Sequence, residues 1–146
     1  MKSRDLSVDA LLDLCNSAPQ KMKLISSDNF SLKPSAAKWS KKEILGHLID
    51  SATANHHRFV RGQFEEPTVY YDQDLFVSVQ NYQAEDLESL ILLWEFYNRH
   101  LAHVIKNIPE NKLGNRCVGK DGSTASLAFL IDDYLNHLQH HLAQII

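Results

Sequence analysis

DDYLNHLQHHLAQII, residues 132–146, has the apolar repeat of an amphipathic helix that begins near Leu127. The stretch holds three of the eight histidines of the chain, His137, His140 and His141. Residues four apart on a helix are neighbours, with Cβ atoms about 5–6 Å apart, so two of these imidazoles can reach one metal ion. Because two ligands do not complete a metal site, we expect a third from elsewhere in the chain.

A helical wheel separates the three histidines by the direction in which each points. At about 100° per residue, the apolar residues of 127–145 cluster in one direction, which marks the core. On one side of that direction, His141 lies about 60° and His137 about 100° away, whereas His140 lies about 160° away. A metal between helices needs ligands on the inward edge, so the wheel predicts His137 and His141 as ligands and His140 as solvent-facing.

Composition and charge are typical of a soluble globular protein. The 146 residues are 44% hydrophobic and 23% charged, which predicts one domain over 1–146 with a buried core. A formal net charge of −3 and dispersed basic residues argue against a nucleic-acid partner. The sequence contains no apolar run of the roughly 18 residues that a membrane span needs, so no membrane partner is expected. With no secretion signal and only two cysteines, we expect a cytoplasmic protein.

Four long segments have helical periodicity, and two of them precede residue 63. Ser7 can cap the first helix, and Pro19 is expected to end or kink it because proline has no N–H to donate. Ser40 and Glu43 form the S-x-x-E pattern of a capping box, which predicts that the second helix starts there. Gly62 is a plausible end for this second helix.

The remaining helices are separated by less regular segments. Residues 27–38 are polar and predict a connector, and Asp72 can cap one or two helical turns before the third helix, expected over 84–107. Asp121–Gly122 is a weak signal for a small hairpin, and Ser126 can cap the fourth helix. These patterns predict an all-α four-helix bundle with a short extra helical segment between helices two and three.

Five other histidines can supply the third ligand. His56 and His57 are adjacent on a helix and point about 100° apart, so they cannot both line one site. His100 and His103 lie beside the apolar stripe of their helix and are expected to be exposed. His47 borders the apolar face of the second helix. Spacing alone leaves His47 either a metal ligand or a structural histidine.

The helical edge that carries His47 also carries candidates for a pocket. Ser51 and Ala54 are small and leave space, which a metal with an open coordination position requires. Arg58 lies three turns beyond His47, where it can bind a carboxylate of a thiol cofactor or form a surface salt bridge.

Three further residues have both a functional and a structural interpretation. Tyr134, one turn before His137, can orient a substrate or donate a proton, or it can belong to the core. Asp72 and Asp74 can line the pocket or support the ligands, or they can cap the short helix that follows them.

Three stretches together resemble the DinB-like family of four-helix-bundle proteins: WSKKEILGHLIDS (39–51), YYDQDLF (70–76) and DYLNHLQHHLAQI (133–145). In that family a divalent metal is typically held by one histidine on the second helix and two on the last. The resemblance therefore implies His47, His137 and His141 as the ligands. The family often has a tryptophan where this chain has Phe76, which can reshape the pocket.

The resemblance also implies a chemistry. Three neutral imidazoles with an open position suit a catalytic zinc or nickel ion. Relatives include transferases that use thiols such as bacillithiol or mycothiol, so we expect a low-molecular-weight thiol, held as thiolate, to attack an electrophilic small molecule. The alternatives are a metal-dependent hydrolase that uses metal-bound water and a non-catalytic, stress-associated metal- or ligand-binding protein. A homodimer is a further candidate assembly.

Overall fold

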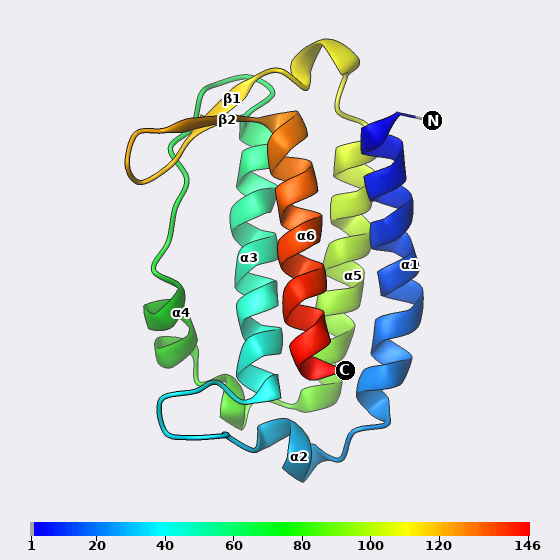
Figure 1. Ribbon diagram of the computed structural model, residues 1–146, viewed down its shortest axis with the longest axis vertical. Coiled ribbons are helices and arrows are strands. Elements are labelled where there is room, and N and C mark those ends of the chain that lie inside the picture. Colours follow the sequence, from blue (N-terminus) through cyan, green and yellow to red (C-terminus); the bar gives the residue numbers. More distant parts are fainter. Residues whose placement is uncertain (1) are drawn as a thin grey trace.

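Four long amphipathic helices form the body of the protein in a computed structural model that describes residues 2–146 (Figure 1). They are α1 (Ser3–Lys23), α3 (Lys41–Arg61), α5 (Leu87–Lys106) and α6 (Leu127–Ile145). Each helix buries one stripe of apolar side chains, as its 3.6-residue period requires. Around the bundle the order is α1, α5, α3 and α6, so α3 and α6 pack side by side. The predicted four-helix bundle is confirmed.

The directions of the helices require a long crossover. In Figure 1, α1 and α6 run downward, whereas α3 and α5 run upward. The chain between α3 and α5 therefore returns along the length of the bundle, outside α3. This crossover contains α4 (Gln73–Gln80) and the 3-10 helix η1 (Tyr82–Ala84). Helix α4 is the extra segment that was predicted, and Asp72 caps it by accepting the N–H of Leu75 at 3.0 Å.

Side-chain caps fix the starts of α3 and α6. The Ser40 hydroxyl accepts the N–H of Glu43 at 3.1 Å, and the Glu43 carboxylate accepts the N–H of Ser40 at 3.0 Å. This reciprocal pair is the predicted capping box, and α3 ends as expected with Gly62 as its C-cap. The Ser126 hydroxyl accepts the N–H of Phe129 at 3.1 Å and caps α6.

Helix α1 corrects the predictions made from Ser7 and Pro19. It begins at Ser3, four residues before the expected cap, and it continues through Pro19. Since proline has no N–H, the carbonyl oxygen of Cys15 lacks its usual partner within the helix. Arg99 of α5 supplies a donor, because its Nη2 lies 3.4 Å from Cys15 O. Packing against α5 thus supports a proline in the interior of α1.

Two further differences from the predictions come from local caps. Helix α2 (Ser27–Ser31) forms inside the predicted connector 27–38, where the Ser26 hydroxyl accepts an N–H of its first turn. Helix α5 starts three residues later than predicted, because Asp86 caps it through the N–H of Ser89 at 2.9 Å.

A small hairpin joins α5 to α6 at the upper end of the bundle (Figure 1). The joining segment contains η2 (Glu110–Lys112), β1 (Arg116–Val118) and β2 (Thr124–Ser126). The strands pair antiparallel, and Gly122 in the turn has a φ of 83°, which a residue without Cβ adopts readily. The hairpin signal is therefore confirmed. A parallel bridge between Thr68 and Val118 ties the crossover to this hairpin.

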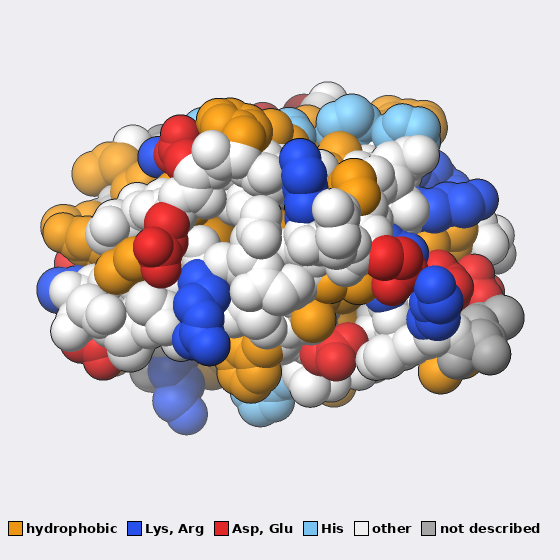
Figure 2. Space-filling view, turned by 90° about the horizontal axis from the view of Figure 1, so that it is seen from above, with side chains coloured by type: hydrophobic (Ala, Val, Ile, Leu, Met, Phe, Trp, Pro, Cys, Tyr) orange, Lys and Arg blue, Asp and Glu red, His pale blue; other side chains and the backbone are white. Residues whose placement is uncertain are grey.

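The surface of this upper end carries charges of both signs. Figure 2 shows Lys and Arg side chains interspersed with Asp and Glu rather than gathered in one patch. Over residues 2–146, none of the helices is long and apolar enough to cross a membrane.

Candidate metal centre

His47 of α3 meets His137 and His141 of α6 where the two helices pack together. Nε2 of His47 lies 3.3 Å from Nε2 of His137, across 90 positions of sequence. One nitrogen from each of the three histidines lies within 4.8 Å of the other two. The centroid of the His47 ring lies 5.1 Å from that of His137 and 4.9 Å from that of His141. The fold thus brings together the three histidines that the family resemblance implied.

Burial keeps two of these imidazoles, those of His47 and His137, neutral. The His47 side chain is fully buried, and this burial lowers its pKa to about 4, with a further lowering from the two neighbouring histidines. His137 is half-buried, and its pKa is also lowered, chiefly by burial. A neutral imidazole offers a ring nitrogen lone pair, which a metal ion needs.

Gln144 orients the ring of His141. Nδ1 of His141 lies 3.0 Å from Oε1 of Gln144. An amide oxygen only accepts hydrogen bonds, so Nδ1 is the donor in this contact and Nε2 is the nitrogen left to bind a metal. Nδ1 of His47, by contrast, is buried and has no hydrogen-bond partner in the described part of the chain. The ring of Trp39 packs beside His47, with centroids 5.0 Å apart.

The spacing and chemistry of the three histidines fit a divalent metal ion. Two nitrogens bound to one tetrahedral zinc ion at about 2.0–2.1 Å lie about 3.3–3.4 Å apart. The Nε2 atoms of His47 and His137 are 3.3 Å apart, so they need little movement to share such an ion. A set of three imidazoles suits zinc, nickel and similar ions, and it leaves at least one coordination position for another ligand.

A cavity of about 250 Å³ lies beside the histidines, between α3, α6 and the start of the crossover. Its lining residues are Ser51, Asn55, Arg58, Tyr70, Tyr71, Gln73, Asp133, Tyr134 and His137. Three of the predicted pocket residues, Ser51, Arg58 and Tyr134, are among them, whereas Ala54 is not. Asn55 also had a sequence signal, because it lies one turn from Ser51 on the same helical edge. Tyr70 and Tyr71 had none beyond the family resemblance, since the crossover has no periodicity.

Arg58 reaches the cavity in a fixed orientation. Its Nη1 donates to Oδ1 of Asn55 at 3.1 Å, and its Nη2 donates to the carbonyl oxygen of Val69 at 2.8 Å. Burial lowers the pKa of Arg58 from its ordinary value. Among the described residues, Arg4, Arg61 and Arg99 are the arginines that form ion pairs within 4.0 Å. The surface salt bridge that the sequence offered as the alternative for Arg58 is therefore not formed.

Tyr134 packs into the core as well as lining the cavity. Its side chain is buried, and its hydroxyl donates to Oδ1 of Asn98 on α5. Burial raises the pKa of this hydroxyl well above its usual value, so Tyr134 holds its proton. Asp72 and Asp74 line a neighbouring hollow with Tyr70 and Lys120 rather than the cavity of His137. The structural interpretation of Asp72 as a helix cap is the one observed.

The remaining histidines lie outside the cluster. His57, His100, His103 and His140 are exposed, as expected for His100 and His103 from their helical positions. His56 is half-buried, and its Nδ1 forms a hydrogen bond of 2.9 Å with the hydroxyl of Tyr97.

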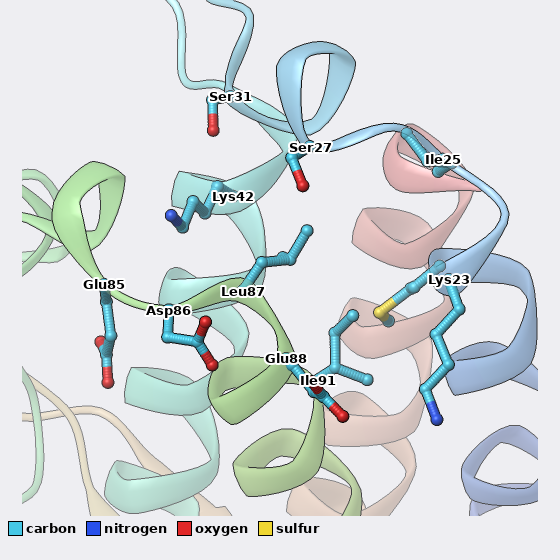
Figure 3. Close-up of a pocket in the computed structure, with 11 residues that line it drawn as sticks. Lys23, Ile25, Ser27, Ser31, Lys42, Glu85, Asp86, Leu87, Glu88 and Ile91 are labelled. Atoms are coloured by element: carbon cyan, nitrogen blue, oxygen red, sulfur yellow. The ribbon is translucent and has the colours of Figure 1, made fainter.

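A larger cavity, of about 570 Å³, lies near α2 at the lower end of the bundle (Figure 3). Figure 3 shows Lys23, Lys42, Glu85, Asp86 and Glu88 around it, so its walls mix both signs of charge. None of its lining residues is a histidine. Size alone therefore does not mark the functional site, and the smaller cavity is the one that adjoins the candidate ligands.

The sequence profile of the DinB superfamily matches residues 15–145 of this chain. Among curated proteins, none matches the sequence significantly.

Solved structures share the fold at low sequence identity. YfiT from Bacillus subtilis, described as a probable metal-dependent hydrolase with an unusual four-helix-bundle topology, superposes with a TM-score of 0.89 at 17% identity. The match covers 99% of this chain and 86% of YfiT. A mycothiol-dependent maleylpyruvate isomerase gives a TM-score of 0.80 at 11% identity, covering 99% of this chain but 61% of the isomerase. A DinB-like protein, YjoA from Bacillus subtilis, gives 0.67 at 18% identity, with coverage of 96% and 86%.

Proposed function

Because this chain belongs to the DinB superfamily, we propose that it is a metal-dependent transferase that joins a low-molecular-weight thiol to an electrophilic small molecule. The observation that carries the proposal is the set of three clustered imidazoles beside a cavity. In this proposal His47, His137 and His141 hold the ion, which is zinc or nickel, and the thiol is one such as bacillithiol.

The descriptions of two structural neighbours support this choice of chemistry. YfiT is described as a probable metal-dependent hydrolase, and the isomerase as mycothiol-dependent. Metal dependence and thiol dependence are therefore both associated with proteins of this fold. Neither description assigns a substrate to the present chain.

The proposed reaction is a substitution at carbon. The thiol sulfur forms a bond to the electrophilic carbon, the bond to the leaving group breaks, and the leaving group keeps that electron pair. The thiol proton passes to solvent. A divalent ion supplies Lewis acidity, which lowers the pKa of a coordinating thiol. The three imidazoles hold the ion without adding negative charge, Gln144 orients His141, and the cavity walls position the electrophile.

Thiol consumption by the metal-loaded protein tests this proposal. Purified protein loaded with zinc or nickel should accelerate the loss of free thiol in the presence of a reactive halide, and a chelator should abolish the effect. His47→Ala should be inactive, whereas His140→Ala should retain the activity because His140 is exposed. A metal-loaded protein that shows no turnover with a broad panel of thiols and electrophiles would favour the non-catalytic binding protein.

A metal-dependent hydrolase is the second candidate, favoured by the description of YfiT. The same three imidazoles could serve a reaction in which water replaces the thiol as the nucleophile. Equal turnover of the electrophile with and without thiol would support hydrolysis over transfer.

The other expectations from sequence remain proposals. They are a single domain, a small-molecule substrate, a cytoplasmic location, no nucleic-acid partner and a homodimer. Light scattering on the eluate of a size-exclusion column measures the molar mass in solution and tests the dimer.

A further inference from the structure

Arg58 places a positive charge at the cavity beside the histidines, and no described carboxylate neutralises it within 4.0 Å. Arg61, one turn further along the same helix, is paired with Glu65 through its Nη2 at 2.6 Å. Arg99 is paired in the same way with Glu95 at 2.9 Å. The hydrogen-bond partners of Arg58 are neutral, and the Asp133 carboxylate acts on it only from beyond 4.0 Å, so its charge remains available to a ligand.

The neighbours of Arg58 hold its guanidinium in place. Asn55 donates through Nδ2 to the carbonyl oxygen of Ser51 at 2.9 Å, which turns its Oδ1 toward Nη1 of Arg58 at 3.1 Å. The carbonyl oxygen of Val69, from the crossover, holds Nη2 at 2.8 Å. A guanidinium has five N–H donors, and these contacts use two of them, so three stay free for another acceptor.

We propose that Arg58 binds a carboxylate group of the ligand and makes carboxylate-bearing molecules the preferred ligands of this cavity. The inference rests on the proposed function, because His137 lines the same cavity and marks the reacting end of the ligand. Guanidinium and carboxylate groups form strong, charge-assisted hydrogen bonds. The carboxylate belongs either to the thiol or to the electrophile.

Asp133 makes the inference more specific. Its exposed carboxylate lines the same cavity, where it repels a carboxylate of the ligand. The charge of Asp133 therefore weakens, without cancelling, the attraction between Arg58 and a ligand carboxylate. Replacing Asp133 with asparagine should strengthen the binding of a monocarboxylate, by roughly twofold for an exposed group.

Binding of butyrate and of its uncharged amide, butyramide, tests the subsite without any turnover. In the metal-free and the zinc-loaded protein, butyrate should shift the NMR signal of the Arg58 Nε–H in a saturable way, and butyramide should not. Arg58→Met should weaken butyrate binding by roughly tenfold or more. Arg61→Met is the matched control and should bind butyrate like the wild type, because Arg61 is already paired.

Two further variants guard against a simple loss of folding in Arg58→Met. Arg58→Lys keeps the charge but loses the planar fork, so its butyrate affinity should fall between those of the wild type and Arg58→Met. Asp133→Asn should move the affinity in the opposite direction. Butyrate and butyramide binding with equal affinity, or equal butyrate affinity in all of these variants, would overturn the subsite.

Matched pairs of reactants then identify which partner carries the carboxylate. If the thiol carries it, Arg58→Met should slow the reaction of cysteine more than that of cysteamine, which lacks the carboxylate. If the electrophile carries it, the same variant should slow bromoacetate more than bromoacetamide. Butyrate binding without any thiol transfer would support the carboxylate subsite but contradict the proposed function. Thiol transfer without a preference for carboxylates would contradict the subsite and leave the proposed function supported.

Discussion

His140 and His141 are adjacent in sequence but differ in surroundings. His141 is half-buried and faces His47, whereas His140 is exposed. We expect His141→Ala to lose tight zinc binding, because two remaining imidazoles hold zinc poorly. His140→Ala should bind zinc like the wild type. Competition with a chromophoric chelator measures both affinities, and a greater loss in His140→Ala would contradict the assignment of ligands on α6.

Asp50 is a buried carboxylic acid whose protonation couples stability to pH. Its Oδ1 accepts from the hydroxyl of Tyr82 at 2.7 Å and from Nε2 of Gln80 at 2.8 Å, but its Oδ2 is buried without a described partner. Burial raises the pKa of Asp50 above the ordinary value of 3.8. The folded state therefore binds more protons than the unfolded state as the pH rises from 3.8 through the raised pKa.

It follows that the wild type loses stability over this pH range relative to Asp50→Asn, which has no such titration. Urea unfolding of the two metal-free proteins between pH 4 and pH 8 measures the difference. The free energy of unfolding of Asp50→Asn minus that of the wild type should increase with pH. A difference that stays constant or decreases would show that Asp50 ionises as readily in the folded state as in the unfolded one.

At the scale of elements, the contact between α1 and α5 explains how Pro19 fits inside a helix. Arg99 donates to the carbonyl oxygen of Cys15, which Pro19 leaves free. In a Pro19→Ala background the alanine N–H can make that bond itself, so Arg99→Met should cost less stability there. A double-mutant cycle on unfolding free energies should give a coupling of about 0.5–1 kcal/mol. Strictly additive effects would mean that Arg99 does not replace the missing donor.

Sequence reasoning located three helix starts from their capping side chains, but it missed the caps Ser26 and Asp86. Ser40 with Glu43, Asp72 and Ser126 all start helices as predicted, because each cap acts within three residues. The prediction that Pro19 ends or kinks the first helix was wrong, because the compensating donor, Arg99, lies on another helix. Tertiary contacts of this kind leave no local pattern.

The candidate site shows the same limit. Helical periodicity placed His137 and His141 on the inward edge of α6, since the apolar stripe defines that direction. It left His47 undecided, because its complete burial depends on how α3 packs against α6. Tyr70 and Tyr71, which line the cavity, come from the crossover. The crossover runs along the outside of α3, and no periodic pattern in the sequence predicts that path.

For the whole molecule, a metal at this site would link α3 to α6 and stabilise the folded bundle. A ligand that binds only the folded state adds about 2.7 kcal/mol at one hundred times its dissociation constant. Zinc should therefore raise the melting temperature of the wild type and of His140→Ala but not of His47→Ala. Calorimetry with and without zinc measures the shift, and an equal rise in His47→Ala would place the zinc elsewhere.

The most direct test of the whole account is the absorption spectrum of cobalt-substituted protein during titration with a small thiol. The account predicts one cobalt ion per chain, held by His47, His137 and His141, and a new sulfur-to-metal charge-transfer band when the thiol is added. His47→Ala should show neither. Cobalt bound at one per chain with a spectrum that thiol leaves unchanged would contradict the thiol-activating metal centre.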